Sequence, residues 1–158
     1  MTKTIAIVGF GPGVSTAMAD RFGAAGFQVA LIARNQQRLD AGVAALKARG
    51  VPAAAFVADA SHPAAIRAAL GDVRAKLGPI AVLHWNAYGG GAGDLLAAGE
   101  GDVRGLFDVA VNGLLAAVQE ALPDLKSAGD GAVLVTNGAF GDLSPRMDGF
   151  AVSMQAMG

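Results

Sequence analysis

Three glycines follow a short apolar run near the N-terminus, at Gly9, Gly11 and Gly13, and the hydroxyl residue Ser15 comes two positions later. A diphosphate group needs close approach to the backbone and free N–H groups at the start of a helix. Glycine permits both, because it lacks a Cβ and accepts a positive φ. Placed between an apolar strand pattern and a helical pattern from Val14, this spacing predicts a loop that binds a dinucleotide diphosphate. The alternative is a tight turn between strand and helix.

A basic residue follows the second apolar run, in the order Ile32, Ala33, Arg34, Asn35. A site for NAD needs an acidic side chain here to bind the ribose 2′-OH. A guanidinium can instead bind a 2′-phosphate through two hydrogen bonds, and a carboxylate would repel that phosphate. With Ala33 in the acidic position and Arg34 after it, the segment predicts NADP(H) rather than NAD(H). A solvated arginine that begins a helix is the alternative.

These two segments resemble the short-chain dehydrogenase/reductase family. Gly9 and Gly13 match the family pattern Gly-x-x-x-Gly-x-Gly, and Ser15 stands where its third glycine lies, with a hydroxyl that could bind phosphate. Ala-Arg-Asn after the second strand implies NADP(H), although the family's frequent second basic residue is Pro12 here. The resemblance implies a cofactor-binding set of Gly9, Gly11, Gly13, Val14, Ser15, Arg34, Asp59, Ala60, Asn86 and Ala87.

Two members of that set carry further expectations. The resemblance assigns Asp59 to the adenine amino group, whereas its local sequence is equally compatible with an aspartate that caps a helix. Asn86 and Ala87 resemble the family's Asn-Asn-Ala-Gly motif, which lines the cofactor, and Tyr88 replaces its glycine. A tyrosine at that place is expected to narrow the pocket.

The catalytic end of the resemblance is incomplete. The family uses a tyrosine phenol as the acid and a lysine four residues later, and Phe150 and Met154 occupy these positions. The family's serine falls at Asn137 or Gly138, of which Asn137 can donate a hydrogen bond. Asn112 matches a helix asparagine that organises a water relay, or it is a polar residue that kinks the helix.

Two functions therefore stay open. One is an NADP(H)-dependent oxidoreductase of a carbonyl or alcohol, whose proton comes from water, from the substrate or from a residue such as Tyr88. The other is a non-catalytic NADP(H)-binding sensor or oligomer partner. His84 and the loop residues Asp142, Ser144 and Arg146 are weaker catalytic candidates, and the substrate is not specified.

Alternating strands and helices must position these residues. The pattern predicts strands at Thr4–Val8, Gln28–Ile32, Ala53–Val57, Ile80–Trp85 and Ala132–Thr136. It predicts helices at Val14–Ala25, Asn35–Arg49, from a Ser61 cap to Leu77, at Gly101–Ala128 with a kink near Pro123, and from near Gly149. The expected fold is α/β, a Rossmann-like doubly wound parallel sheet of about five strands with helices on both faces. We expect one domain over residues 1–158, and the bare fifth strand indicates that the chain is truncated or that a partner covers it.

Composition narrows the partners. Hydrophobic residues make up 53% of the chain and charged residues 16%, against about 25% in an ordinary domain, which favours a covered surface. The net charge of −1 gives no field for nucleic acid or an anionic membrane. Without cysteines and with two histidines, no metal site is expected. We expect a cytoplasmic protein without a membrane span, and the resemblance implies a homodimer or homotetramer formed through the long helices.

Overall fold

A computed structural model describes residues 2–89, 96–137 and 156–157 of the chain. Its strands are β1 (Thr4–Val8), β2 (Gln28–Ala33), β3 (Ala53–Val57), β4 (Ile80–Trp85) and β5 (Ala132–Val135). Its helices are α1 (Val14–Ala24), α2 (Gln36–Lys47), α3 (Pro63–Leu77), α4 (Glu100–Phe107), the π-helix η1 (Asp108–Gly113) and α5 (Leu114–Ser127). The expected helix from near Gly149 begins outside the described residues.

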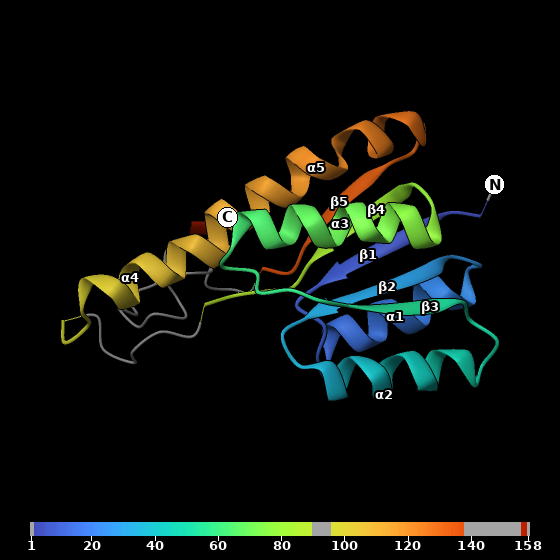
Figure 1. Ribbon diagram of the computed structural model, residues 1–158, viewed down its shortest axis with the longest axis horizontal. Helices are drawn as coiled ribbons and strands as arrows, with labels where there is room; N and C mark the ends of the chain where they lie inside the picture. The colour runs from blue at the N-terminus through green and yellow to red at the C-terminus, as the bar shows by residue number, and fades with distance from the viewer. Residues whose placement is uncertain (1, 90–95, 138–155, 158) are drawn as a thin grey trace.

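The described strands form one parallel sheet in the order β3-β2-β1-β4-β5. Helices α1 and α2 cover one face, and α3 and α5 cover the other (Figure 1). Strands β1 to β3 are added toward one edge of the sheet, and β4 and β5 are added on the other side of β1. The carboxyl ends of β1 and β4 therefore form the switch point at which such folds bind ligands. The predicted doubly wound α/β fold is confirmed.

Two apolar cores sandwich the sheet, because consecutive residues of each strand point to opposite faces. Ala6 and Val8 of β1 pack with α3 and α5, whereas Ile5 and Ile7 pack with α1 and α2. Every residue of β1 and β4 is buried, as expected for the centre of a doubly covered parallel sheet. The ends of these two strands are therefore rigid supports for the residues that follow them.

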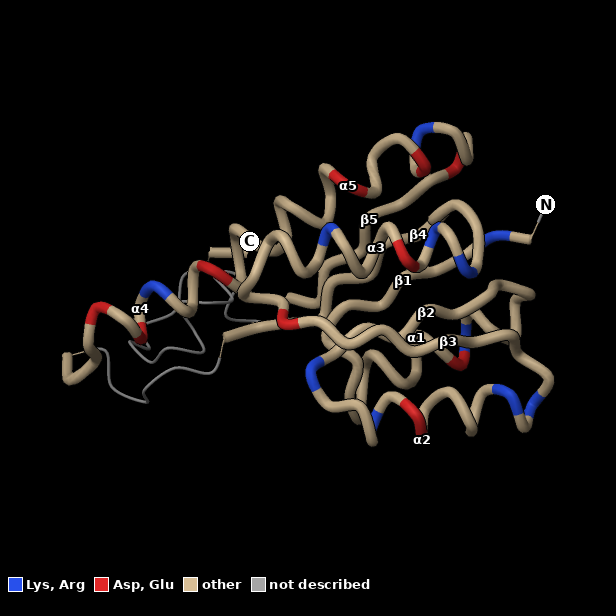
Figure 2. The backbone as a smooth tube through the Cα atoms, viewed as in Figure 1, with Lys and Arg blue, Asp and Glu red and all other residues tan. Residues whose placement is uncertain are grey.

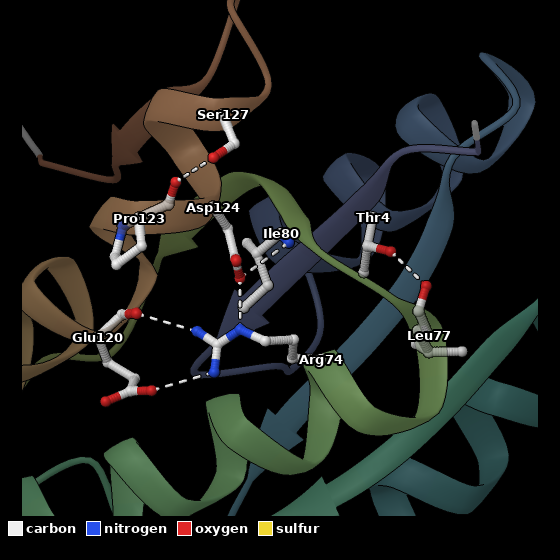
Figure 3. Close-up of polar contacts among 8 residues, drawn as sticks. All are labelled: Thr4, Arg74, Leu77, Ile80, Glu120, Pro123, Asp124 and Ser127. Carbon is white, nitrogen blue, oxygen red and sulfur yellow. Dashed lines mark hydrogen bonds and ion pairs between the residues drawn. The ribbon is translucent and has the colours of Figure 1, made fainter.

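A polar contact joins α3 to α5 at the opposite end of the sheet from the glycine loop. Arg74 Nε donates to Asp124 Oδ2 over 2.8 Å, and its terminal nitrogens donate to the carboxylate and the backbone carbonyl of Glu120 (Figure 3). Asp124 also accepts from the backbone N–H of Ile80 at the start of β4. These bonds raise the pKa of the Arg74 guanidinium further and fix α5 against the sheet.

The predicted start of α3 was one residue early. The N-cap is His62, with Pro63 in the first turn, and not Ser61. Ser61 instead donates its hydroxyl and its backbone N–H to Asp59 Oδ1, at 2.8 and 2.9 Å. Because this turn between Asp59 and Ser61 occupies both groups, the helix begins after it. Asp59 is likewise not the cap of α3, so the helix-cap interpretation of this aspartate was wrong.

The single helix predicted for Gly101–Ala128 is three elements. Its irregular part is η1, and α5 runs through Pro123, where the kink was expected, to Ser127. Because Gly113 has no side chain, the helix can pack closely against the turn after β3: a Cβ on Gly113 would overlap the backbone carbonyl of Ala60 and lie 3.0 Å from Trp85. Close approach of the helix to the turn after β3 therefore accompanies the wider π-helical turn, a feature that local spacing does not reveal.

The stretch Glu100–Ser127 is also long and apolar enough to cross a membrane by length and composition, with a mean hydropathy of 1.3. The core helix of a soluble protein passes the same test, and α5 packs on α3 and β4. One helix of this kind is weak support for a membrane span, and the expectation of no span stays a prediction.

Candidate functional site

The predicted diphosphate loop has the backbone that its glycines suggested. Gly9 and Gly13 have φ angles of +83° and +93°, in the region that side chains rarely adopt. A Cβ on Gly9 would lie 2.5 Å from the backbone nitrogen of Ala87, so the turn after β1 lies directly against the turn after β4. Asn86 Nδ2 donates to the carbonyl oxygen of Gly9 over 3.1 Å and holds the two turns together.

Helix α1 begins with backbone donors that no side chain in the described part of the chain caps. Its N-cap is Gly13, which offers no side chain to accept from the N–H groups of the first turn. A Cβ on Gly13 would meet no atom of residues 2–89, 96–137 or 156–157 within 4 Å, so these residues leave the backbone there open to a ligand. Free N–H groups and the positive end of the helix dipole favour an anion at this place. The loop therefore fits a diphosphate, as its spacing predicts.

The side chain of Ser15 does not face a ligand. Its Oγ accepts from the N–H of Gly11 and donates to the carbonyl of the same residue, both over 2.8 Å, and the residue is fully buried. The expectation that this hydroxyl could bind phosphate was wrong, because the loop's own backbone uses it. Thr16 Oγ1 donates to the same carbonyl over 2.7 Å. The two hydroxyls stabilise the loop from within, which a glycine in place of Ser15 could not do.

A cavity of about 1090 Å³ lies beside this loop. It brings together the predicted residues Gly9, Gly11, Arg34, Asp59, Ala60, Asn86 and Ala87, and Tyr88 also lines it. In the described part of the chain, the lining does not include the predicted Gly13, Val14, Ser15, Asn112 or Asn137. The carboxyl ends of several parallel strands meet here, which is why residues far apart in sequence share one cavity.

Two of the predicted catalytic residues, Asn112 and Asn137, lie outside the cavity lining. Asn112 is exposed in η1, and its Nδ2 donates to Asp108 Oδ1 over 2.9 Å. Asn137 is exposed just after β5. Phe150 and Met154, at the family's tyrosine and lysine positions, lie outside the described residues, as do Gly138 and the loop residues Asp142, Ser144 and Arg146. Their roles stay predictions.

Opposite charges meet at the rim of the cavity. Burial alone would raise the pKa of Asp59, but the hydrogen bonds from Ser61 and the charge of Arg34 outweigh it, so this pKa is lower than usual. Asp59 is thus ionised at neutral pH and attracts the exposed Arg34 guanidinium toward the cavity. Positively charged residues gather around the start of α2 (Figure 2). This end of the cavity therefore suits a phosphate better than a neutral ribose hydroxyl.

Sequence reasoning missed Arg38. It lies in the first turn of α2, lines the same cavity, and a Cβ on Gly11 would be 3.6 Å from its Nη1 atom. The available signal was weak, a second basic residue in the first turn of the predicted helix, because Arg34 precedes the N-cap Asn35 and helical spacing does not relate the two arginines. Pattern alone could not show that this side chain turns toward the glycine loop.

No group of three or more His, Asp or Glu side chains that could hold a metal ion comes together in the part of the chain that the structure describes. His84 is buried between strands, with Nε2 2.8 Å from Thr136 Oγ1, and it does not line the cavity. His84 is therefore packed within the sheet and does not face the cavity.

Comparison with known proteins agrees with this geometry. Residues 3–148 match the sequence profile of short chain dehydrogenases. The chain belongs to this family. An uncharacterized oxidoreductase of Mycobacterium tuberculosis is 29% identical over 150 residues, which cover 94% of this chain and 56% of that protein. A short chain dehydrogenase of Pseudocercospora fijiensis is 36% identical over 81 residues, or 51% of this chain and 26% of the relative.

Solved structures show the same fold. The L-sorbose reductase of Gluconobacter frateurii, in complex with NADPH and L-sorbose, superposes with a TM-score of 0.90 at 22% identity, covering 99% of this chain and 60% of the reductase. A blue fluorescent protein from a metagenomic library, in complex with NADPH, gives 0.88 at 26% identity, covering 98% and 64%. The chain therefore spans less than two thirds of the length of these relatives.

Proposed function

We propose that this chain is an NADP(H)-binding short-chain dehydrogenase/reductase-like oxidoreductase that interconverts a carbonyl and an alcohol. The observation that carries the proposal is that Gly9 and Gly11, in the loop that leads into the uncapped start of α1, line one cavity together with Arg34, with Ala33 where an NAD site needs a carboxylate. The family and the NADPH complexes of its structural relatives support it. When bound, the nicotinamide supplies or accepts the hydride.

The residues of the chain would divide the binding among them. The first N–H groups of α1 would bind the diphosphate, and Arg34 would bind the 2′-phosphate. Asp59 would accept from the adenine amino group with the oxygen that Ser61 leaves free. Asn86, by tying its turn to Gly9, would keep the floor of the cavity fixed before the ligand arrives. A pre-arranged site loses less entropy on binding.

Titration with NADPH, NADP, NADH and NAD by calorimetry tests this assignment. The native protein should bind the phosphorylated pair more tightly, and Arg34→Ala should weaken only that pair, by roughly 10- to 100-fold, because a charge-assisted hydrogen bond is lost. Arg21→Ala, which removes an exposed guanidinium from the far end of α1, is the matched control. An equal loss for NADH would contradict the assignment of Arg34 to the 2′-phosphate.

Proton delivery is the second part of the proposal. With Phe150 and Met154 at the usual acid and lysine positions, we infer that water, the substrate or Tyr88 supplies the proton. Tyr88 is the one tyrosine of the sequence, and it lines the cavity. NADPH oxidation across a panel of carbonyl compounds should be detectable, slow, and faster in a Phe150→Tyr, Met154→Lys variant. Tight binding with no turnover in either protein would favour the alternative, a non-catalytic NADP(H)-binding sensor or oligomer partner.

The cellular location, oligomeric state and partners of the protein are also proposals. We infer a single cytoplasmic domain that forms a homodimer or homotetramer and binds neither nucleic acid nor membrane. The net charge of −1 and the exposed apolar side chains Phe107, Leu115 and Leu122 along α4 and α5 support it. Sedimentation velocity of the purified chain should show a dimer or larger species. A monomer at micromolar concentration would contradict the oligomer.

A further inference from the structure

Three side chains meet in the turn between β3 and α3. Ser61 Oγ donates to Asp59 Oδ1 over 2.8 Å and lies 3.0 Å from His62 Nδ1. The same imidazole nitrogen lies 3.8 Å from the other carboxylate oxygen, Asp59 Oδ2. Asp59 and Ser61 line the cavity, whereas His62 is not among its lining residues. His62 can therefore act on a ligand in the cavity only through these two neighbours.

The backbone fixes His62 relative to Asp59. Its N–H donates to the carbonyl of Asp59 over 3.1 Å, and its own carbonyl accepts from Ile66 over 3.1 Å. Pro63 follows it and restricts its backbone to an extended conformation, with a φ of −113° and a ψ of 98°. His62 is the N-cap of α3, but its side chain makes no capping hydrogen bond. The imidazole is therefore held near Ser61 and Asp59 without a second role at the start of the helix.

The hydroxyl of Ser61 has one proton and two acceptors within hydrogen-bond distance. A neutral imidazole without a proton on Nδ1 can accept that proton, and Asp59 then loses the bond from Ser61 Oγ. An imidazolium carries protons on both nitrogens, so its Nδ1 can only donate. Ser61 then donates to Asp59, and a positive charge lies beside Oδ2. Histidine side chains ordinarily change between these two forms near about pH 6.5.

The Asp59 carboxylate stays ionised while the imidazole titrates. Burial raises the pKa of Asp59, but the hydrogen bonds from Ser61 and the charges of Arg34 and His62 outweigh it, so this pKa is lower than usual. The charge of the imidazole therefore acts on an anion throughout the titration.

The elements that pack against α3 add little to the titration of this turn. Strands β1, β2 and β3 carry no charged side chain, and the charged residues of η1 and α5 are Asp108, Glu120, Asp124 and Lys126. Asp108 accepts from Asn112, the two acidic residues of α5 bond to Arg74, and the lysine lies in the last turn of α5. Within α3, the first charged residue after the turn is Arg67, which donates to Gln119.

We propose that His62 is a positioning residue that makes the recognition of adenine by Asp59 depend on pH. This rests on the proposed function, in which the carboxylate oxygen that Ser61 leaves free accepts from the adenine amino group. When His62 is neutral, this oxygen is available to the nucleobase. When His62 is protonated, its Nδ1–H and its charge compete with the amino group for the same carboxylate. Acidification through about pH 6.5 should therefore weaken the recognition of adenine.

The test compares NADP with nicotinamide hypoxanthine dinucleotide phosphate, in which a carbonyl oxygen replaces the adenine amino group. Both carry the same phosphates, so the ratio of their affinities removes the titration of the phosphates themselves. Calorimetry on the full chain at about pH 7.5 and about pH 5.5, on either side of the ordinary histidine value, gives this ratio. His62→Gln removes the titration, and His62→Lys keeps a positive charge at both pH values. His84→Gln, which removes the buried histidine outside the cavity, is the matched control.

In the native protein, the preference for NADP should fall about three- to fivefold from the higher to the lower pH, the size expected for an exposed ion pair. The effect is modest because the side chains of His62 and Asp59 are 71% and 37% exposed. His62→Gln should keep the higher preference at both pH values, His62→Lys should show the lower one at both, and His84→Gln should behave as the native protein does.

Three results would overturn the proposal. The first is a native preference that does not change with pH, and the second is the same fall in His62→Gln as in the native protein. The third is an equal loss of affinity for both dinucleotides in His62→Gln at both pH values, with a lower unfolding midpoint. That result would show that His62 acts only on the stability of the start of α3.

Failure of the proposed function gives a different pattern. If the native protein binds neither dinucleotide, the cofactor assignment fails and this inference fails with it. If it binds both equally at the higher pH, Asp59 does not bind the amino group, and the inference also fails. If it prefers NADP equally at both pH values, the proposed function stands and only the inference about His62 is wrong.

Discussion

The nucleotide-binding region, β1 to β3 with α1 and α2, differs from the region formed by α4, η1, α5 and β5. In the first, β1 is buried throughout and β2 is buried except at its ends. In the second, β5 alternates between half-buried and exposed residues, and Val133 and Val135 are exposed. Among the described residues, two large apolar side chains of the first region are exposed, Val14 and Val57, against five in the second region. The glycine loop and Arg34 therefore follow strands that are more fully buried than β5.

Substituting Gly9 tests how closely the first region is packed. Gly9→Ala should lower the free energy of unfolding by about 3 kcal/mol, because its Cβ would overlap the backbone of Asn86 and Ala87 at a φ of +83°. Gly26→Ala is the matched control: its φ is +88°, but nothing lies within 4 Å, so about 1 kcal/mol is expected. Urea unfolding of both variants gives the comparison. Equal losses would mean that backbone conformation alone, and not contact with the turn after β4, explains the need for Gly9.

Substituting Arg74 tests how the second region is held to the sheet. Arg74→Met should cost about 1 to 2 kcal/mol, because Asp124 and the carbonyl of Glu120 lose a charged donor. Arg67→Met, in the same helix, loses only a bond to the neutral Gln119 and should cost less than about 0.5 kcal/mol. We expect the thermal unfolding midpoint of Arg74→Met to fall while its nucleotide affinity stays unchanged. A loss of nucleotide affinity in Arg74→Met would show that the two regions are not independent.

The smallest effect concerns the junction of β4 and β5. Burial lowers the pKa of His84, so between its folded pKa and its unfolded value of about 6.5 the native state binds fewer protons than the unfolded state. Stability should therefore rise with pH through this window and fall as the solution is acidified below about 6.5. His84→Gln should flatten that slope, while His62→Gln, at the exposed start of α3, should keep it. Urea midpoints measured across the window test this, and parallel slopes in both variants would exclude His84 as the source.

Much of the nucleotide site could be predicted because its signals are local. The loop from Gly9 to Gly13, and the change from Ala33 to Arg34, are short segments whose chemistry is visible in a few consecutive residues. The strands were also placed within a residue or so, since each is a short apolar run that ends at a turn. Arg38 escaped prediction because only the packing of α2 against the sheet brings it over Gly11.

The sequence by itself determined the alternation of strands and helices, the glycine loop and the basic end of β2, because backbone freedom, hydrophobic period and charge are properties of neighbouring residues. The tertiary structure decided the strand order, the inward turn of the Ser15 hydroxyl, the start of α3 after His62 and the π-helical turn beside Ala60. Each of these depends on contact between parts of the chain that lie apart in sequence or on competition for one hydrogen-bonding group. The pattern of neighbouring residues predicts neither such contacts nor the outcome of such competition.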